Sequence, residues 1–195
     1  MQRKTNLIII LLFIMNCSCK ARVSDKELNF SINKILTTKM EQNFFEHKKE
    51  GSYIAKNLTK KEFDENKKRV LNRFLLLRKS LLNSSSSYKS KGFVLIEQIN
   101  MEVFDYLGYL VIDDKIYSSR NGKLSSYQNE NSLKEKKPEI GNFITRVLNK
   151  EKPIFYSDGS NPNCYHGCLS NPIITIVENG KVKEFYEAKI GDNTD

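Results

Sequence analysis

The sequence predicts an α+β domain, in which an antiparallel sheet of hairpins carries two N-terminal helices and one later helix. Three observations predict this fold class. Apolar residues recur at helical spacing in two long segments before residue 84. After residue 92 the chain reads as short apolar strands, and the turn pairs Asn121-Gly122 and Asn179-Gly180 separate two pairs of them. Consecutive hairpins build an antiparallel sheet, and we expect the helices to pack on one face of it.

The first predicted helix starts after Ser24 and stops before Gly51, a residue that commonly ends helices. Ser24 and Glu27 have the spacing of a capping box, in which each side chain binds the backbone N–H group of the other residue. The apolar face consists of Leu28, Ile32, Ile35, Leu36, Met40 and Phe44. The pair Thr37-Thr38 has a low helix propensity, so a break at this point is an alternative.

The second predicted helix begins after Thr59, which forms another capping box with Glu62, and ends at Asn83. Its broad apolar face consists of Phe63, Val70, Leu71, Phe74, Leu75, Leu77, Leu81 and Leu82. Its basic residues are expected mainly on the other side, and they are Lys67, Lys68, Arg69, Arg73, Arg78 and Lys79. We interpret that side as the solvated face of a core-packing helix, with a nucleic-acid or membrane-binding face as the alternative.

The remainder of the chain reads mainly as strands. A serine-rich linker at residues 84–87 is a candidate hinge before this part. Residues 103–112 are apolar on both faces, as expected of a central strand. The other predicted strands are residues 93–99, 115–119, 124–127, 154–156, 173–177 and 181–186. Residues 128–137 are predicted to be a surface loop, and Pro138 is predicted to open a short helix that ends at residue 148.

Residues 1–19 form a sorting signal rather than part of the fold. Arg3 and Lys4 precede an apolar run from Leu7 to Met15, which has the length of a secretory signal core. This run is far shorter than the roughly 20 apolar residues of a membrane-spanning helix. Cys17-Ser18-Cys19 follows it.

This cysteine-containing end resembles the lipobox of bacterial lipoproteins, where a small residue precedes a cysteine that is acylated and becomes the mature N-terminus. The resemblance covers the signal alone and implies lipidation at Cys19, which follows Ser18, with Cys17 as the alternative. It also implies a lipid anchor that holds the protein at the bacterial cell envelope, on the periplasmic or surface side. The expected division of the chain is a signal peptide (1–18), a tether (19–24) and one α+β domain (25–190), with a helical part (25–83) and a mainly β part (92–190).

The chain is basic, with 32 Lys and Arg residues against 23 Asp and Glu residues and a formal net charge of +9. Such a balance fits nucleic acid, an anionic membrane surface or an acidic partner. We expect no nucleic-acid partner, because nucleic acid is the poorest of these three for an exported protein. The expected partners are therefore the membrane, through the N-terminal lipid, and an envelope protein.

The loop at residues 157–172 is dense in Gly, Pro, Asn and Ser and contains Cys164, His166 and Cys168. With Cys19 lipidated and the signal removed, Cys164 and Cys168 remain as a pair that an oxidising compartment would join in a disulfide. A metal site with two thiolates and an imidazole is an alternative, although no fourth ligand is evident. Thiol-dependent redox chemistry is another, but the spacing is C-x-x-x-C and differs from the C-x-x-C of thioredoxin-type motifs.

The sequence predicts binding rather than catalysis. It contains no G-x-S-x-G, no H-E-x-x-H and no Gly-rich phosphate loop. Asp113-Asp114 lies at a predicted hairpin tip, where such a pair more often makes a turn than a catalytic site. We expect a lipid-anchored protein that binds its partner through the sheet and the Cys164–Cys168 loop, without a cofactor. The alternative is a metal-handling or thiol-dependent redox protein centred on Cys164, His166 and Cys168.

Overall fold

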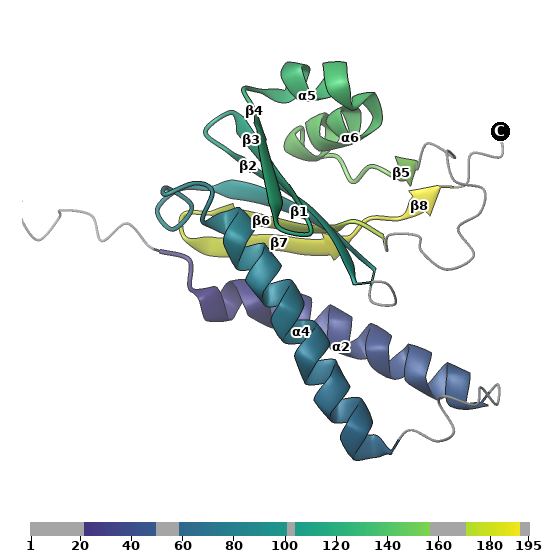
Figure 1. The fold of residues 1–195 in the computed structure, drawn as a ribbon. Coiled ribbons are helices and arrows are strands. Elements are labelled where there is room, and N and C mark those ends of the chain that lie inside the picture. The colour runs from purple at the N-terminus through teal and green to yellow at the C-terminus, as the bar shows by residue number, and fades with distance from the viewer. Residues whose placement is uncertain (1–21, 50–58, 101–103, 157–170, 192–195) are drawn as a thin grey trace, which may run out of the picture.

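The structure of the chain is a computed structural model that describes residues 22–49, 59–100, 104–156 and 171–191. Within these ranges it consists of a six-stranded antiparallel sheet with helices on both faces, and of a separate two-stranded pair (Figure 1). The predicted α+β fold with an antiparallel sheet is confirmed. None of the helices in these ranges has the length and hydrophobicity that crossing a bilayer requires.

The large sheet contains β1 (Phe93–Asn100), β2 (Asp105–Ile112), β3 (Lys115–Arg120), β4 (Lys123–Tyr127), β6 (Ile173–Glu178) and β7 (Lys181–Glu187). Its strands lie in the order β4-β3-β2-β1-β6-β7, and every neighbouring pair is antiparallel. The separate pair joins β5 (Phe155–Tyr156) to β8 (Ile190–Gly191) in parallel. Each predicted strand is found close to its expected bounds, and β2 lies inside the sheet as predicted, whereas β8 was not predicted.

Two-residue turns join β2 to β3, β3 to β4 and β6 to β7. Both central residues of each turn have positive φ, with values of 52° and 61° at Asp113-Asp114, 51° and 88° at Asn121-Gly122, and 50° and 70° at Asn179-Gly180. Positive φ at both positions characterises the type I′ turn, whose twist matches that of the flanking strands and for which Asn-Gly is preferred. The hairpins predicted from these pairs are therefore confirmed.

The helices α2 (Asp25–Lys49) and α4 (Lys60–Leu82) cover one face of the sheet. At the start of α4 the Glu62 N–H donates to Thr59 Oγ1 at 3.2 Å, and the Thr59 N–H donates to the Glu62 carboxylate at 2.8 Å. The predicted capping box of α4 is therefore confirmed, and Asn83 is the C-cap residue as expected.

The capping box predicted for α2 is only half formed. The Glu27 N–H donates to Ser24 Oγ at 3.1 Å, but the Glu27 carboxylate accepts the Val182 N–H of β7 at 2.9 Å. Glu27 thus ties the first turn of α2 to the edge of the sheet instead of closing the box. The helix continues through Thr37-Thr38, so the alternative of a break at this pair is wrong.

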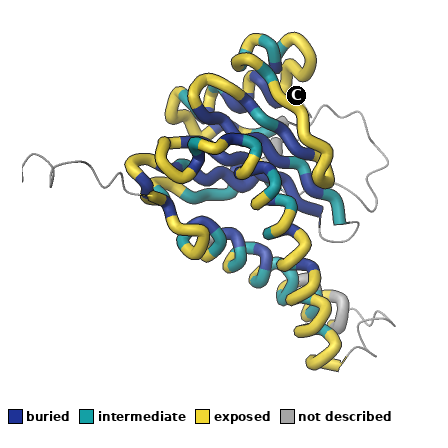
Figure 2. The backbone as a smooth tube through the Cα atoms, turned by 60° about the vertical axis from the view of Figure 1, so that its left-hand side comes forward, coloured by how far each residue is buried: buried dark blue, intermediate teal, exposed yellow. Residues whose placement is uncertain are grey.

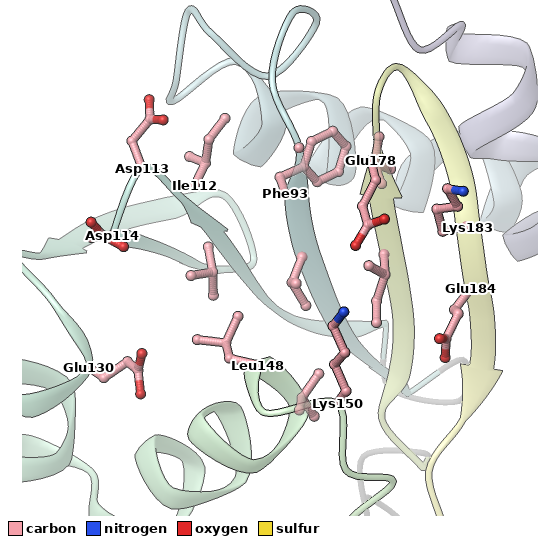
Figure 3. Close-up of a pocket in the computed structure, with 16 residues that line it drawn as sticks. Phe93, Ile112, Asp113, Asp114, Glu130, Leu148, Lys150, Glu178, Lys183 and Glu184 are labelled. Atoms are coloured by element: carbon pink, nitrogen blue, oxygen red, sulfur yellow. The ribbon is translucent and has the colours of Figure 1, made fainter.

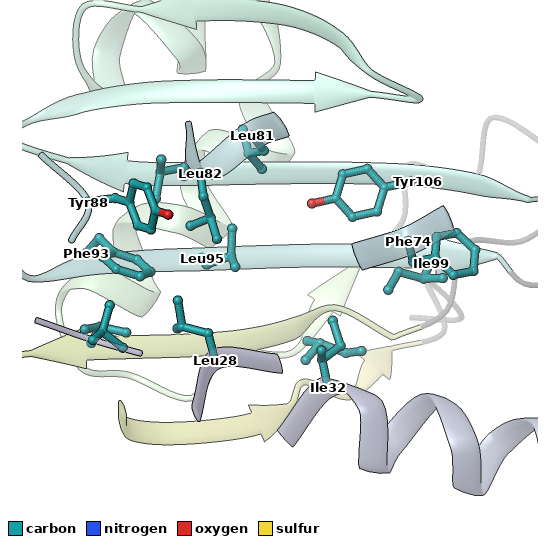
Figure 4. Close-up of a cluster of buried hydrophobic side chains, with 14 of the residues drawn as sticks. Leu28, Ile32, Phe74, Leu81, Leu82, Tyr88, Phe93, Leu95, Ile99 and Tyr106 are labelled. Atoms are coloured by element: carbon teal, nitrogen blue, oxygen red, sulfur yellow. The ribbon is translucent and has the colours of Figure 1, made fainter. Parts of the chain in front are cut away.

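The core on this face is formed by alternate residues of the strands and by the apolar sides of α2 and α4 (Figure 4). Its main members are Leu28, Ile32, Leu36, Val70, Phe74, Leu81 and Leu82 from the helices, and Phe93, Leu95, Ile99, Tyr106, Leu110, Ile112, Ile173 and Val177 from the sheet. Burying one such side chain contributes about 1.5–3 kcal/mol to stability. Figure 2 shows that buried residues are concentrated in the sheet, while the far ends of α2 and α4 are largely exposed.

The helices α5 (Glu130–Lys136) and α6 (Pro138–Leu148) cover the opposite face. The second core contains Val94, Ile96, Tyr109, Val111, Ile116 and Ile174 from the sheet, and Leu133, Ile140, Phe143, Ile144 and Val147 from these helices. The expectation that all helices pack on one face is therefore wrong. Because β1 lies between two helix layers, all of its residues are buried.

The predicted surface loop at residues 128–137 contains α5, so this prediction is wrong. The Asn129 side chain accepts the Ser132 N–H at 3.0 Å, and the Asn129 N–H donates to the Ser132 hydroxyl at 3.2 Å. This reciprocal cap starts a helix in a polar segment. Leu133 fixes the helix on the sheet, because its side chain is completely buried.

The serine-rich segment at residues 84–87 is a set of hydrogen-bonded turns between α4 and β1. The Ser84 hydroxyl donates to the Leu81 carbonyl at 2.6 Å, and the Ser85 and Ser87 hydroxyl oxygens lie 2.9 Å apart. Ser85 is buried, and Tyr88, which directly follows the segment, belongs to the core beneath α2 and α4. The segment therefore contributes contacts to the fold, which an open linker would not do.

Candidate functional site

The site residues expected from the sequence lie outside the described residues. They are Cys17, Cys19, Cys164, His166 and Cys168. Lipidation, the disulfide and the alternative metal site therefore stay predictions. Within the described ranges, charged side chains converge most clearly on a pocket at one end of the sheet.

We call this the turn-end pocket, because the β2–β3 and β6–β7 turns meet the end of α6 there (Figure 3). Its volume is about 470 Å³. Its apolar lining consists mainly of Phe93, Val94, Val111, Ile112, Leu148 and Ile176. Its charged lining consists of the carboxylates of Asp113, Asp114, Glu130, Glu178 and Glu184 and the amines of Lys150 and Lys183. The pocket is therefore apolar on one part of its surface and mostly acidic on the other.

Two of the carboxylates are held by neighbouring side chains. Lys91 Nζ lies 2.6 Å from Asp113 Oδ2, and the Ser87 hydroxyl donates to the same oxygen at 3.3 Å. The hydrogen bond from Lys91 is the main cause that lowers the pKa of Asp113, so this carboxylate is ionised at neutral pH. Glu130 accepts the Thr145 hydroxyl of α6 at 2.6 Å.

The other three carboxylates have no cationic partner among the described residues. No ion pair within 4.0 Å joins Asp114, Glu178 or Glu184 to another residue of these ranges. The lining as a whole carries five carboxylates and two amines, on a chain whose formal net charge is +9. The pocket is thus locally negative, and its potential favours a positively charged ligand.

Lys150 enters the pocket from an unusual backbone position. The Lys150 N–H donates to the Val147 carbonyl, and the Glu151 N–H donates to the Arg146 carbonyl, both at 3.0 Å. These two hydrogen bonds form a Schellman motif, in which the residue after the C-cap is usually glycine. Lys150 occupies that position with φ at +62°, and Figure 3 shows its side chain extending from the end of α6 into the pocket.

The described lining combines apolar surface with charged side chains. It contains no Ser, Thr, Cys, His or Tyr side chain that could act as a nucleophile with an adjacent base. No three His, Cys, Asp or Glu residues among those described are close enough to hold a metal ion. A volume of this size lies within the range of ligand pockets.

The Cys164–Cys168 loop directly precedes β6, which starts at Ile173, whereas Glu178 at the other end of β6 lines the pocket. At about 3.3 Å per residue, the two ends of this strand are separated by roughly 17 Å. Residues 157–170 of the loop lie outside the described residues, and none of the described lining comes from them.

A second polar cluster is enclosed between the α2/α4 layer and the sheet. Arg78 of α4 lies 3.3 Å from the Glu97 carboxylate of β1, and the Tyr106 hydroxyl of β2 donates to Glu97 at 3.0 Å. Arg78 also donates to the Leu28 carbonyl of α2 at 2.6 Å and to the Thr175 hydroxyl of β6 at 3.4 Å. The cluster therefore connects both helices to three strands.

This cluster is shielded from solvent and so is structural. Arg78 is 1% exposed and Glu97 and Tyr106 are 0% exposed. Burial is the main cause that raises the pKa of Glu97, against the opposing effect of Arg78, and burial raises the pKa of Tyr106 well above its usual value. No ligand reaches these groups without opening the core.

Sequence reasoning placed Arg78 on the solvated face of its helix, and this is wrong. Arg78 follows Phe74 by four residues and precedes Leu81 by three, and both of these are buried. Residues at these spacings share one face of a helix, so the pattern itself could have placed Arg78 inside. The turn-end pocket was missed because its charged residues come from separate turns, helix ends and strands that only the tertiary fold brings together.

The chain was also compared with known proteins. No protein-family model matches it, and no curated protein and no solved structure is significantly similar to it.

Proposed function

We propose that the chain is a lipid-anchored protein of the bacterial cell envelope that acts by binding. In this proposal the turn-end pocket receives a basic side chain of an envelope protein partner. The signal-like N-terminus that ends in Cys17-Ser18-Cys19 supports the location. The mixed apolar and acidic lining of the pocket supports binding, and it is the observation that carries the proposal.

A lysine or arginine side chain fits such a lining for a physical reason. Its aliphatic stem can lie on apolar surface while its charged head stays near solvent. In the turn-end pocket the stem would contact residues such as Val111 and Ile176. The head would meet the carboxylates of Glu178 and Glu184, which form no ion pair with another described residue. A neutral side chain of the same length would gain only the first contact.

The expected affinity of this contact alone is low. An exposed ion pair contributes about 0.2–1 kcal/mol, because water and salt screen it. A stable protein complex buries about 1,600 Å² in total, which is far more than one side chain provides. The pocket would therefore select the partner's basic residue, and the surrounding surface would supply the rest of the affinity.

The pocket is tested with two blocked tripeptides, acetyl-Gly-Lys-Gly-amide and acetyl-Gly-Gln-Gly-amide. We expect the lysine peptide, at millimolar concentration, to shift the methyl NMR signals of Val111 and Ile176 in a saturable way. The double substitution Glu178→Gln and Glu184→Gln should weaken this binding about threefold to tenfold. Glu135→Gln, an exposed position on α5 outside the pocket, is the matched control. Equal binding of both peptides would contradict the proposal.

The anchor is tested separately by metabolic labelling with palmitate. We expect Cys19→Ala to abolish the label and to release the chain from the membrane. Cys17→Ala is the matched control and should keep the label. Loss of the label in Cys17→Ala, with the label kept in Cys19→Ala, would place the lipid on Cys17. If neither the parent chain nor Cys17→Ala is labelled, the proposed lipid anchor is wrong.

A further inference from the structure

The start of α2 exposes an aromatic ring between two lysines. Phe30 is 68% exposed, whereas its neighbours Leu28 and Ile32 are buried, and Phe45 near the other end of the same helix is 65% exposed. Lys26 and Lys34 precede and follow Phe30 by four residues, so the three side chains lie along one stripe of the helix. We call this the Lys26–Phe30–Lys34 stripe.

The surface beside the stripe combines apolar and polar side chains. A groove of about 540 Å³ between α2 and β7 is lined by Phe30, Ile35 and Phe185 together with Lys34, Thr38, Lys39, Gln42 and Glu187. A hollow of about 460 Å³ is lined by Phe30 and Val182 together with Ser24, Lys26 and Glu27. Phe30 therefore borders two depressions at the margin of the helix and the edge strand.

The two charged side chains within the stripe are both cationic. Lys26 and Lys34 are exposed, and neither forms an ion pair within 4.0 Å with another described residue. Of the nearest acidic residues along α2 and β7, Glu187 pairs with Lys39, whereas Glu27 accepts the Val182 N–H, a neutral donor that does not offset the charge of a carboxylate. Asp25 lies in the first turn of α2, where the helix dipole stabilises a carboxylate.

The position of the stripe along the chain limits what can cover it. Asp25 follows Cys19 by six residues, which span at most about 20 Å when fully extended. Phe30 lies five residues further on, about 8 Å along the helix axis. A lipid on Cys19 would therefore hold the stripe within about 30 Å of a membrane surface.

We propose that the Lys26–Phe30–Lys34 stripe rests on the surface of an anionic membrane. This inference relies on the lipid anchor of the proposed function and adds an orientation to it. Phe30 enters the boundary between headgroups and acyl chains, and the two lysines contact the anionic headgroups. One exposed aromatic ring flanked by cations suits such a boundary, where apolar burial and attraction to anionic lipids act together.

This orientation leaves the turn-end pocket accessible. The stripe lies on α2 beside the edge strand β7, whereas α5 and α6 cover the face of the sheet opposite α2 and α4 (Figure 1). The pocket is lined by Leu148 and Lys150 at the end of α6 and so belongs partly to the layer remote from the membrane. A partner protein could reach the pocket while the lipid and the stripe hold the chain in place.

The chain has no tryptophan, so a single introduced one reports its own surroundings. The lipidated full chain carrying Phe30→Trp is placed on vesicles of phosphatidylglycerol or of phosphatidylcholine, with and without brominated acyl chains. We expect a blue-shifted emission and strong quenching by bromine, both larger on phosphatidylglycerol. Leu124→Trp is the matched control, because Leu124 is 49% exposed on β4 at the other edge of the sheet, and it should stay unquenched.

The role of the lysines is tested in the Phe30→Trp background. Lys26→Gln together with Lys34→Gln should reduce the quenching on phosphatidylglycerol at least twofold and leave it unchanged on phosphatidylcholine. Equal quenching on both lipids, or equal quenching of the two tryptophan positions, would overturn the inference. Co-flotation of the protein with the vesicles distinguishes a wrong orientation from a failed anchor. A chain without its lipid anchor does not float with the vesicles, whereas an anchored chain in another orientation does.

Discussion

The Arg78 guanidinium lies 3.3 Å from the Glu97 carboxylate, and both side chains are almost completely buried. The pair connects α4 to β1, the strand that is covered by helices on both faces. Two charges that have been removed from water depend on each other, because neither can be solvated when its partner is lost. This pair therefore dominates the response of the fold to substitution.

Arg78→Met is expected to lower the free energy of unfolding by about 3–5 kcal/mol, because it leaves Glu97 charged and unpaired in the core. The double substitution Arg78→Met with Glu97→Met should cost less than Arg78→Met alone. Urea denaturation measures both. Lys79→Met, at the exposed neighbouring position, is the control and should change stability by less than about 0.5 kcal/mol. A double variant less stable than the single one would contradict the role of the pair.

The pH dependence of stability should reveal Glu97. Burial raises its folded-state pKa above 4.5, so the folded chain binds this proton more tightly than the unfolded chain does. The ionised carboxylate therefore lowers stability at neutral pH, and this penalty is relieved as the pH falls through the raised pKa toward 4.5.

We expect the parent chain to gain stability relative to Glu97→Gln as the pH is lowered over this window. Urea denaturation of both chains at each pH gives the difference, in which titrations common to both cancel. A difference that changes in the opposite direction would mean that Arg78 lowers the pKa of Glu97 more than burial raises it.

Gly108 should tolerate no side chain, because the Tyr106 hydroxyl occupies the space. A Cβ atom on residue 108 would lie 2.5 Å from the Tyr106 hydroxyl and 2.6 Å from Leu81 Cδ2. Gly108 is paired with Glu97 in the β1–β2 register, which is how the ring of Tyr106 reaches that carboxylate. Gly108→Ala should therefore destabilise the chain by about 1–3 kcal/mol.

Tyr106→Phe tests this explanation. It removes the hydroxyl that the alanine would meet, so Gly108→Ala should cost less in a Tyr106→Phe background than in the parent. A double-mutant cycle measured by thermal or urea unfolding gives the coupling. Strict additivity of the two substitutions would show that another contact, such as the one with Leu81, causes the loss.

The elements of the fold were largely predictable because their signals are local. Asn121-Gly122 and Asn179-Gly180 adopt positive φ with little strain, so each pair specifies a hairpin whatever lies around it. The capping box of Thr59 and Glu62 defines the start of α4 in the same way. The cap of α5 was missed because Asn129 and Ser132 replace the usual serine and glutamate.

The candidate site was not predictable because it depends on tertiary contacts. The pocket joins Asp114, Lys150 and Glu178, which lie far apart in the sequence at three different places in the fold. Each of these residues on its own indicates only a turn, a helix end or a strand end. The partner of Arg78 was not predictable for the same reason, because Glu97 belongs to a strand that no local sequence pattern connects to α4.

Cys164 and Cys168 are predicted to form a disulfide in the exported chain. The intact mass should increase by two hydrogens on reduction and should remain constant in the variant with Cys164→Ser and Cys168→Ser. The closed loop is short, so the disulfide should add about 2 kcal/mol or less to stability. Stoichiometric zinc or copper bound by the reduced chain, and lost in His166→Ala, would favour the metal site instead.

Lys150→Gly is expected to raise stability and binding together. A residue other than glycine at φ of +62° costs about 1–2 kcal/mol, so glycine should raise the free energy of unfolding by about 1 kcal/mol. The substitution also removes a cation from the turn-end pocket, so the lysine tripeptide should bind more tightly. Lys150→Ala is the matched control, because it removes the amine but keeps the strained backbone. It should therefore strengthen binding of the lysine tripeptide without raising the free energy of unfolding. If Lys150→Ala stabilises the chain as much as Lys150→Gly does, the amine at position 150, and not the backbone conformation, is unfavourable.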